Sequence, residues 1–220
     1  MKLATALSKS ILWRGFYFLS VMLLNILVAR HFQSDGSGQI YYIINLLAFT
    51  LIVVSLCLEV PMGYYLSQKK LNETQLTVLT ICWTVLVLIL AYFVIQRFSG
   101  ADGIPFERNS FEFSANVFLA GNLLITFFVA MFYAKLDFFV PNLLLSGVNL
   151  LLIVLVPNNQ RMQGLLTDEQ YINLYFGGFL LQGIFLAVFF IFKYVKWKEF
   201  RVIPAPLLKS LFSFAVITVV

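Results

Sequence analysis

Residues 74–95 read TQLTVLTICWTVLVLILAYFVI, a run without a single Asp, Glu, Lys or Arg. About 20 consecutive apolar residues are enough to cross the hydrocarbon core of a bilayer as a helix. A helix is required there because lipid offers no hydrogen-bond partners for an unpaired backbone. The run therefore predicts a transmembrane helix.

Comparable runs repeat along the rest of the chain and predict an all-α, polytopic transmembrane helix bundle. We expect six helices and the start of a seventh: Ser10–Ala29, Gln39–Leu66, Thr74–Ile95, Phe113–Tyr133, Pro141–Val156, Ile172–Tyr194 and a run from about Pro206. Residues 1–200 would form a six-helix lobe, and residues 201–220 a linker and the opening of helix seven. Because the last run ends without a polar tail, we expect the sequence to be part of a longer protein.

The composition agrees with this reading. Hydrophobic residues make up 61% of the chain and charged residues 11%, whereas soluble domains carry about 25% charge. The net charge is +5, but the charges lie mainly in the breaks between apolar runs, without long basic tracts. This placement is typical of membrane topology and argues against a nucleic-acid partner.

The distribution of Lys and Arg predicts the orientation. Eleven of the 15 would lie on the side of the N-terminus and of the second-to-third, fourth-to-fifth and sixth-to-seventh breaks. The others, Arg30, Arg97, Arg108 and Arg161, would lie opposite. Because cytoplasmic loops are enriched in Lys and Arg, we expect a multi-pass protein of the cytoplasmic (inner) membrane with a cytoplasmic N-terminus.

Polar residues inside the runs recur at helical spacing. The clearest stripe is Asn142, Ser146 and Asn149, and further candidates are Asn25 and Gln182. Such stripes face either a water-filled interior or a neighbouring helix, to which Asn, Ser and Gln bond. For any single Asn, helix adhesion is the stronger alternative. Glycines within the runs would permit close helix approach or bending: Gly121, Gly147, Gly177, Gly178 and Gly183.

Two charged residues within the runs, Arg14 and Glu59, are stronger candidates for functional groups than the asparagines. Arg14 either extends to the interface or serves as a binding group. Glu59 lies deeper, and Pro61 cannot donate to the carbonyl of Cys57, so we expect a bend there. A carboxylate beside such a bend could bind a cation, a proton or a sugar hydroxyl, or it could pair with Arg14 across the first two helices.

Catalytic signatures are missing. The single histidine, His31, has no Cys or carboxylate cluster near it in sequence, and no GxxxxGK[ST] motif or dinucleotide fingerprint occurs. We therefore expect no enzyme, no metal site and no cofactor.

Four short segments carry a resemblance to a known family. They are LSKSILWRG (7–15), ARHFQSDGSGQIY (29–41), SLCLEVP (55–61) and FYAKLDFFVPN (132–142). Together they resemble the N-terminal half of the polysaccharide-biosynthesis (oligosaccharide flippase) proteins of the multidrug/oligosaccharidyl-lipid/polysaccharide exporter superfamily. The resemblance implies the N-lobe of a MATE-like transporter with two six-helix lobes.

The resemblance also implies a function. The protein would move a lipid-linked oligosaccharide, carried on a polyprenyl diphosphate, to the outer leaflet by alternating access. Arg14, and less strongly Arg30, would meet the diphosphate, while Glu59, Asn25, Asn142, Asn149 and Gln182 would line the sugar path. Membrane lipid and a glycan polymerase or other assembly proteins are the expected partners. The alternatives are an ion-coupled drug or metabolite antiporter of the same superfamily and a non-transporting membrane scaffold subunit.

Overall fold

The computed structural model describes residues 3–98, 108–155 and 168–219, and these contain helices and no strand. Their bounds are α1 Leu3–Ser55, α2 Glu59–Ser67, α3 Glu73–Phe98, α4 Arg108–Ala134, α5 Phe139–Leu155, α6 Asp168–Tyr194, a 3-10 turn at Trp197–Glu199, and α7 Ala205–Val219. The all-α prediction is confirmed.

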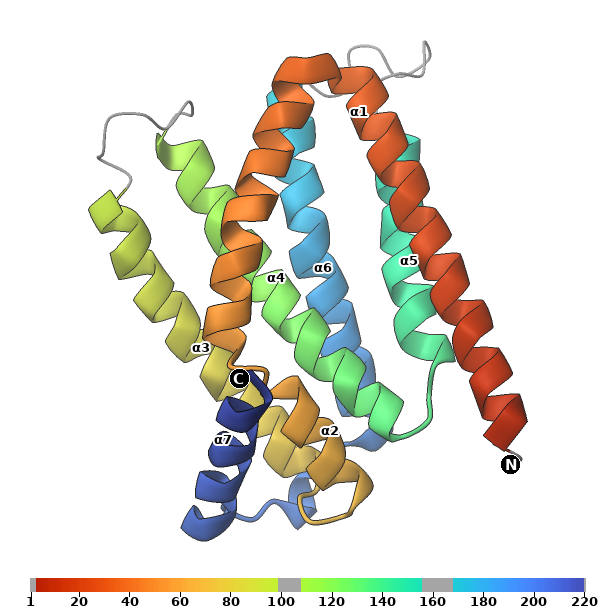
Figure 1. Ribbon diagram of the computed structural model, residues 1–220, viewed down its shortest axis with the longest axis vertical. Helices are drawn as coiled ribbons and strands as arrows, with labels where there is room; N and C mark the ends of the chain where they lie inside the picture. The colour runs from red at the N-terminus through yellow and green to blue at the C-terminus, as the bar shows by residue number, and fades with distance from the viewer. Residues whose placement is uncertain (1–2, 99–107, 156–167, 220) are drawn as a thin grey trace.

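Helix α1 holds two of the expected spans. It rises along one limb, bends sharply and descends along a second limb (Figure 1). The apolar stretches Ser8–Phe32 and Ile40–Ser55 form these limbs. We expected a non-helical turn between them, and this was wrong, because the backbone is helical through residues 30–38. The connection contains no proline, so nothing in it prevents main-chain hydrogen bonding from continuing around the bend.

The expected bend in the second span is confirmed, but its place differs. Helices α1 and α2 meet at 46° across Leu56–Leu58. Leu56 and Cys57 have φ values of 49° and 50°, a left-handed backbone that interrupts the helix. Pro61 then lies in the first turn of α2, where its missing N–H costs no helical hydrogen bond.

Apolar length supports a membrane protein. Four helices are long and apolar enough to span a bilayer, or five if the bent pair counts as one span. Helices α5 and α7 are shorter apolar helices among the described residues. Large apolar side chains stay exposed on the outer faces of the bundle, including Ile11, Phe49 and Phe93. Such a surface suits lipid better than water.

The helices alternate in direction, so their connections gather at two ends (Figure 1). The N-terminus and residues 68–72, 135–138 and 195–204 lie at one end, which we call the basic end. The bend of α1 lies at the opposite end. This grouping is the one that the order of the expected spans implied, and the assignment of the basic end to the cytoplasm, which rests on the Lys and Arg distribution, remains a prediction.

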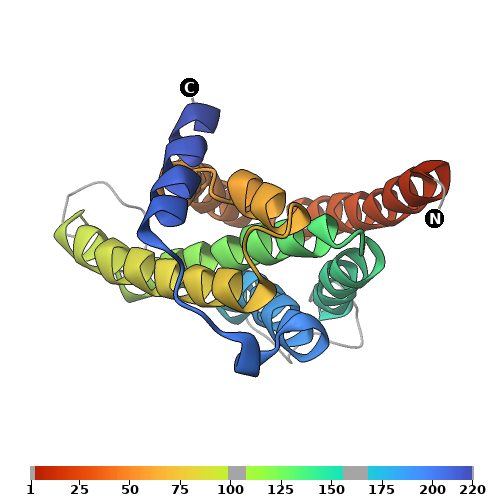
Figure 2. The same cartoon turned by 90° about the horizontal axis from the view of Figure 1, so that it is seen from below.

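Two apolar cores run through the bundle. One joins α2, α3, α4, α6 and α7, with Leu145 of α5, around Phe127, Phe132 and Phe190. The other joins both limbs of α1 to α4, α5 and α6 around Val28, Ile40 and Phe176. Helix α7 packs on α2, on the side of the bundle away from α5 (Figure 2).

Candidate functional site

Two of the predicted site residues, Asn149 and Gln182, are buried where α1, α5 and α6 meet. The Gln182 amide donates to the Asn149 side-chain oxygen at 2.8 Å and to the Leu145 carbonyl at 3.1 Å. The Asn149 amide in turn donates to Ser20 Oγ at 3.0 Å. Asn149 and Gln182 are 5% and 4% exposed. A closed chain of bonds from α6 through α5 to α1 is what helix adhesion requires, because each amide finds a partner inside the protein.

Asn142 lies two turns before Asn149 on α5 and is 1% exposed. Its amide group donates to the Phe138 carbonyl at 2.7 Å and lies 3.1 Å from the Tyr133 hydroxyl. The predicted α5 stripe is therefore buried along its whole length. Ser146, between the two asparagines, has a buried hydroxyl without a hydrogen-bond partner.

Arg14 contacts the ring of Tyr133, the tyrosine whose hydroxyl bonds to Asn142. Its guanidinium carbon lies 4.4 Å from the centre of the Tyr133 ring, a cation–π contact. The side chain is otherwise exposed on the first limb of α1. The guanidinium thus keeps donors available toward the outside of the bundle, while its position is fixed by the same tyrosine that bonds Asn142.

Glu59 begins α2, directly after the broken turn. It is half-buried, and its Oε2 atom is buried without a hydrogen-bond partner. None of the ion pairs among the described residues joins Glu59 to Arg14, so the two do not fasten α1 to α2 as one alternative supposed. Among the buried side-chain atoms that lack a partner in the described residues, this is the one that belongs to a carboxyl group.

The remaining two candidates lie apart from these clusters. Asn25 is half-buried. Its backbone carbonyl accepts a hydrogen bond from the Tyr41 hydroxyl at 3.3 Å, which links the two limbs of α1. Arg30 is exposed on the first limb, near the bend.

The sequence analysis did not predict a set of hydrogen bonds at the basic end that joins the start of α3 to residues 196–201. Asn72 and Gln75 form a capping box at the start of α3, each side chain accepting the other's backbone N–H at 2.8 and 3.0 Å. The side chains of Asn72, Thr74 and Gln75 also donate to the carbonyls of Glu199, Lys196 and Arg201. The N-x-x-Q spacing before an apolar run could have revealed the box. Nothing in the sequence pointed to the carbonyls of residues 196–201.

Ion pairs reinforce the same end. Lys135 pairs with Glu73, and Lys193 pairs with Asp137 at 2.8 Å. The Tyr194 hydroxyl adds a bond to Asp137 at 3.0 Å. These contacts join the α4–α5 connection to α3 and α6. Together with the hydrogen bonds from α3 to residues 196–201, they hold α3, the α4–α5 connection and the end of α6 together just before the chain enters α7.

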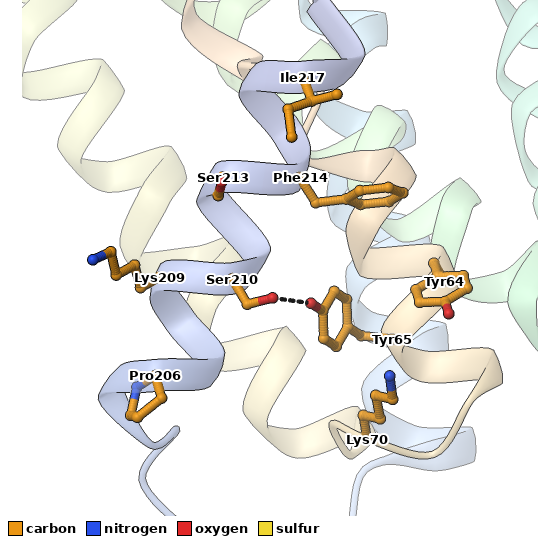
Figure 3. Close-up of a pocket in the computed structure, with 9 residues that line it drawn as sticks. All are labelled: Tyr64, Tyr65, Lys70, Pro206, Lys209, Ser210, Ser213, Phe214 and Ile217. Carbon is orange, nitrogen blue, oxygen red and sulfur yellow. Dashed lines mark hydrogen bonds between the residues drawn. The ribbon is translucent and has the colours of Figure 1, made fainter.

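A groove of about 730 Å³ opens between α2 and α7 (Figure 3). No sequence pattern singled it out, because its two walls are far apart in the chain. It contains none of the predicted site residues. Its walls combine lysine, tyrosine and serine with apolar side chains.

The predicted site residues differ in whether their polar groups already have hydrogen-bond partners inside the protein. Asn142, Asn149 and Gln182 already hold protein partners, whereas Arg14 and Glu59 retain unused hydrogen-bonding capacity. Comparisons with protein-family models, with curated proteins and with solved structures found no match.

Proposed function

We propose that this protein is a membrane flippase, which moves a lipid-linked oligosaccharide on a polyprenyl diphosphate across the cytoplasmic membrane by alternating access. The observation that carries the proposal is the broken second span, with Glu59 at the start of α2 and its carboxylate oxygen unpartnered. In transporters, discontinuous membrane helices with ionisable residues beside them mark substrate and ion sites.

The roles follow from the unused groups. Arg14 would meet the diphosphate, because a guanidinium presents a planar fork of donors that matches phosphate oxygens. Its contact with Tyr133, in the last turn of α4, would hold the fork in place. Glu59 would accept a sugar hydroxyl or take up a proton during the cycle. Asn149 and Gln182 would keep α1, α5 and α6 together, and Asn142 would hold the start of α5 to the end of α4 through Tyr133, while the lobe moves as one body.

The test measures glycan at the cell surface in a strain that depends on this protein. Arg14→Ala should abolish export while the amount of protein in the membrane stays normal, and Arg14→Lys should restore only part of it. Arg97→Ala is the matched control, since Arg97 is an exposed arginine in the last turn of α3. Normal export by the Arg14→Ala variant would remove Arg14 from the mechanism.

An ion-coupled antiporter is the second candidate, and Glu59 is the observation that favours it. In that case Glu59→Gln should abolish gradient-driven efflux of a drug from vesicles and leave surface glycan unchanged. A flippase predicts the reverse pattern, with loss of surface glycan and no efflux phenotype. A non-transporting scaffold, which the closed amide chain would also suit, predicts that neither readout changes.

A further inference from the structure

The groove between α2 and α7 has walls of two kinds. It is lined by Tyr64 and Tyr65 of α2, by Lys70 of the following connection, and by Pro206, Lys209, Ser210, Ser213, Phe214 and Ile217 of α7. The α7 residues facing it recur at three- and four-residue intervals and so share one face of that helix. Figure 3 shows the hydroxyl groups midway along the groove, with Ile217 toward one end and Lys70 toward the other.

Polarity changes along the axis of α7. Ser210 and Ser213 precede Phe214 and Ile217, and the step from Ser210 to Ile217 is about 10 Å at the helical rise. The Lys70 end belongs to the connection 68–72, which lies at the basic end of the bundle. The apolar residues therefore follow on the side toward the middle of the bundle. A charged side chain at the basic end, followed by apolar side chains further in, matches a lipid, whose charged headgroup lies at the interface and whose acyl chain lies in the membrane.

Lys70 is a cation that has no acidic partner within the part of the chain that the structure describes. Its ammonium nitrogen lies 5.6 Å from the ring centres of both Tyr64 and Tyr65. The ion pairs of the described residues involve Lys135, Lys193 and Lys196, and neither Lys70 nor Lys209 takes part in one. The two rings hold the ammonium over the groove, and its N–H donors remain available to an anion.

The hydroxyls add a donor beside it. Tyr65 and Ser210 share a hydrogen bond of 2.6 Å across the groove, which links α2 to α7. Whichever oxygen donates, the other hydroxyl keeps its own hydrogen and can donate it to a third group. Lys70 toward one end of the groove and this hydroxyl pair midway along it thus present cationic and neutral donors to the same groove.

We propose that this groove binds an anionic phospholipid, with its phosphate at Lys70 and the Tyr65–Ser210 pair and an acyl chain along Phe214 and Ile217. A soluble phosphate compound would leave the apolar half uncovered, and a neutral lipid would leave Lys70 without a counter-charge. The bound lipid would brace α7 against α2. The site is independent of the transported substrate proposed above.

The experiment measures lipid retained by the purified protein in native mass spectrometry, after reconstitution with equal phosphatidylglycerol and phosphatidylcholine. The wild type should retain phosphatidylglycerol preferentially. Lys70→Gln should weaken that retention about five- to tenfold, the effect of one cationic contact at a membrane surface. Lys69→Gln is the control, because Lys69 is exposed and adjacent but does not line the groove.

A second variant separates binding from folding. Tyr65→Phe keeps the buried ring and removes only the hydroxyl, so the protein should fold and retain less phosphatidylglycerol. Equal retention of the two lipids, or equal losses in Lys69→Gln and Lys70→Gln, would overturn the proposal. A polyprenyl diphosphate that displaces phosphatidylglycerol at an equimolar ratio would also overturn it, since the groove would then belong to the transported lipid.

Discussion

Substituting alanine for Gly121 should separate the two helices that pack most closely. A Cβ atom at Gly121 of α4 would lie 2.3 Å from the Phe179 carbonyl carbon and 2.5 Å from the Leu180 nitrogen of α6. Both are backbone atoms, so no side-chain rotation can relieve the clash. Gly183 repeats the arrangement from α6, because a Cβ there would lie 2.8 Å from the Gly121 carbonyl oxygen.

The size of the effect follows from these distances. Carbon atoms in contact are about 3.5–4.0 Å apart, so α4 must move from α6 by about 1 Å or more. Forcing such a shift in a packed interior costs about 1–3 kcal/mol. For a chain of this size, each kcal/mol corresponds to about 2–4 °C in Tm. We therefore expect the Tm of Gly121→Ala to fall by several degrees.

Thermal unfolding in detergent, followed by tryptophan fluorescence, measures this change. Gly177→Ala is the matched control on α6, because a Cβ at Gly177 meets nothing within 4 Å. Its Tm should stay constant or rise slightly, since alanine is the better helix former. If both variants had the wild-type Tm, the close contact between α4 and α6 would be refuted.

Three further outcomes are expected. Asn149→Leu leaves the Ser20 hydroxyl and the Gln182 amide short of a partner and should lower stability by about 1–3 kcal/mol, and a double-mutant cycle with Ser20→Ala should give a coupling energy above zero. Gln75→Ala removes half of the capping box and the bond to the Arg201 carbonyl, so limited proteolysis within residues 195–204 should accelerate. Lys198→Gln is the control and should leave the rate of proteolysis unchanged. A reporter that is active only outside the cell should be active when fused after Gln160, and silence there would reverse the orientation.

The sequence alone predicted apolar helices of membrane-spanning length, although it did not predict that residues 30–38 continue the helix. Uninterrupted apolar runs such as residues 74–95 require helices in lipid, and that requirement is met within each run. The spacing of Asn142, Ser146 and Asn149 placed them on one buried face, because the helical period is local. The bend of the second span was expected at Pro61 but lies at Leu56–Leu58, where two residues other than glycine have positive φ, and residue type did not predict that. Gly121, Gly178 and Gly183 do approach a neighbouring helix closely, whereas a Cβ at Gly147 or Gly177 would meet nothing within 4 Å, so residue type indicated where close approach was possible but not where it occurs.

The tertiary structure alone decided which faces meet. Asn149 bonds to Ser20 and Gln182, residues 129 and 33 positions away, and no periodicity within α5 selects those partners. The groove likewise joins Tyr65 to Ser210 across 145 residues. Helix rotation and packing against neighbours fix such pairs, and these depend on the whole bundle at once. A helical run determines which of its side chains share a face, whereas the neighbouring helices determine what that face touches.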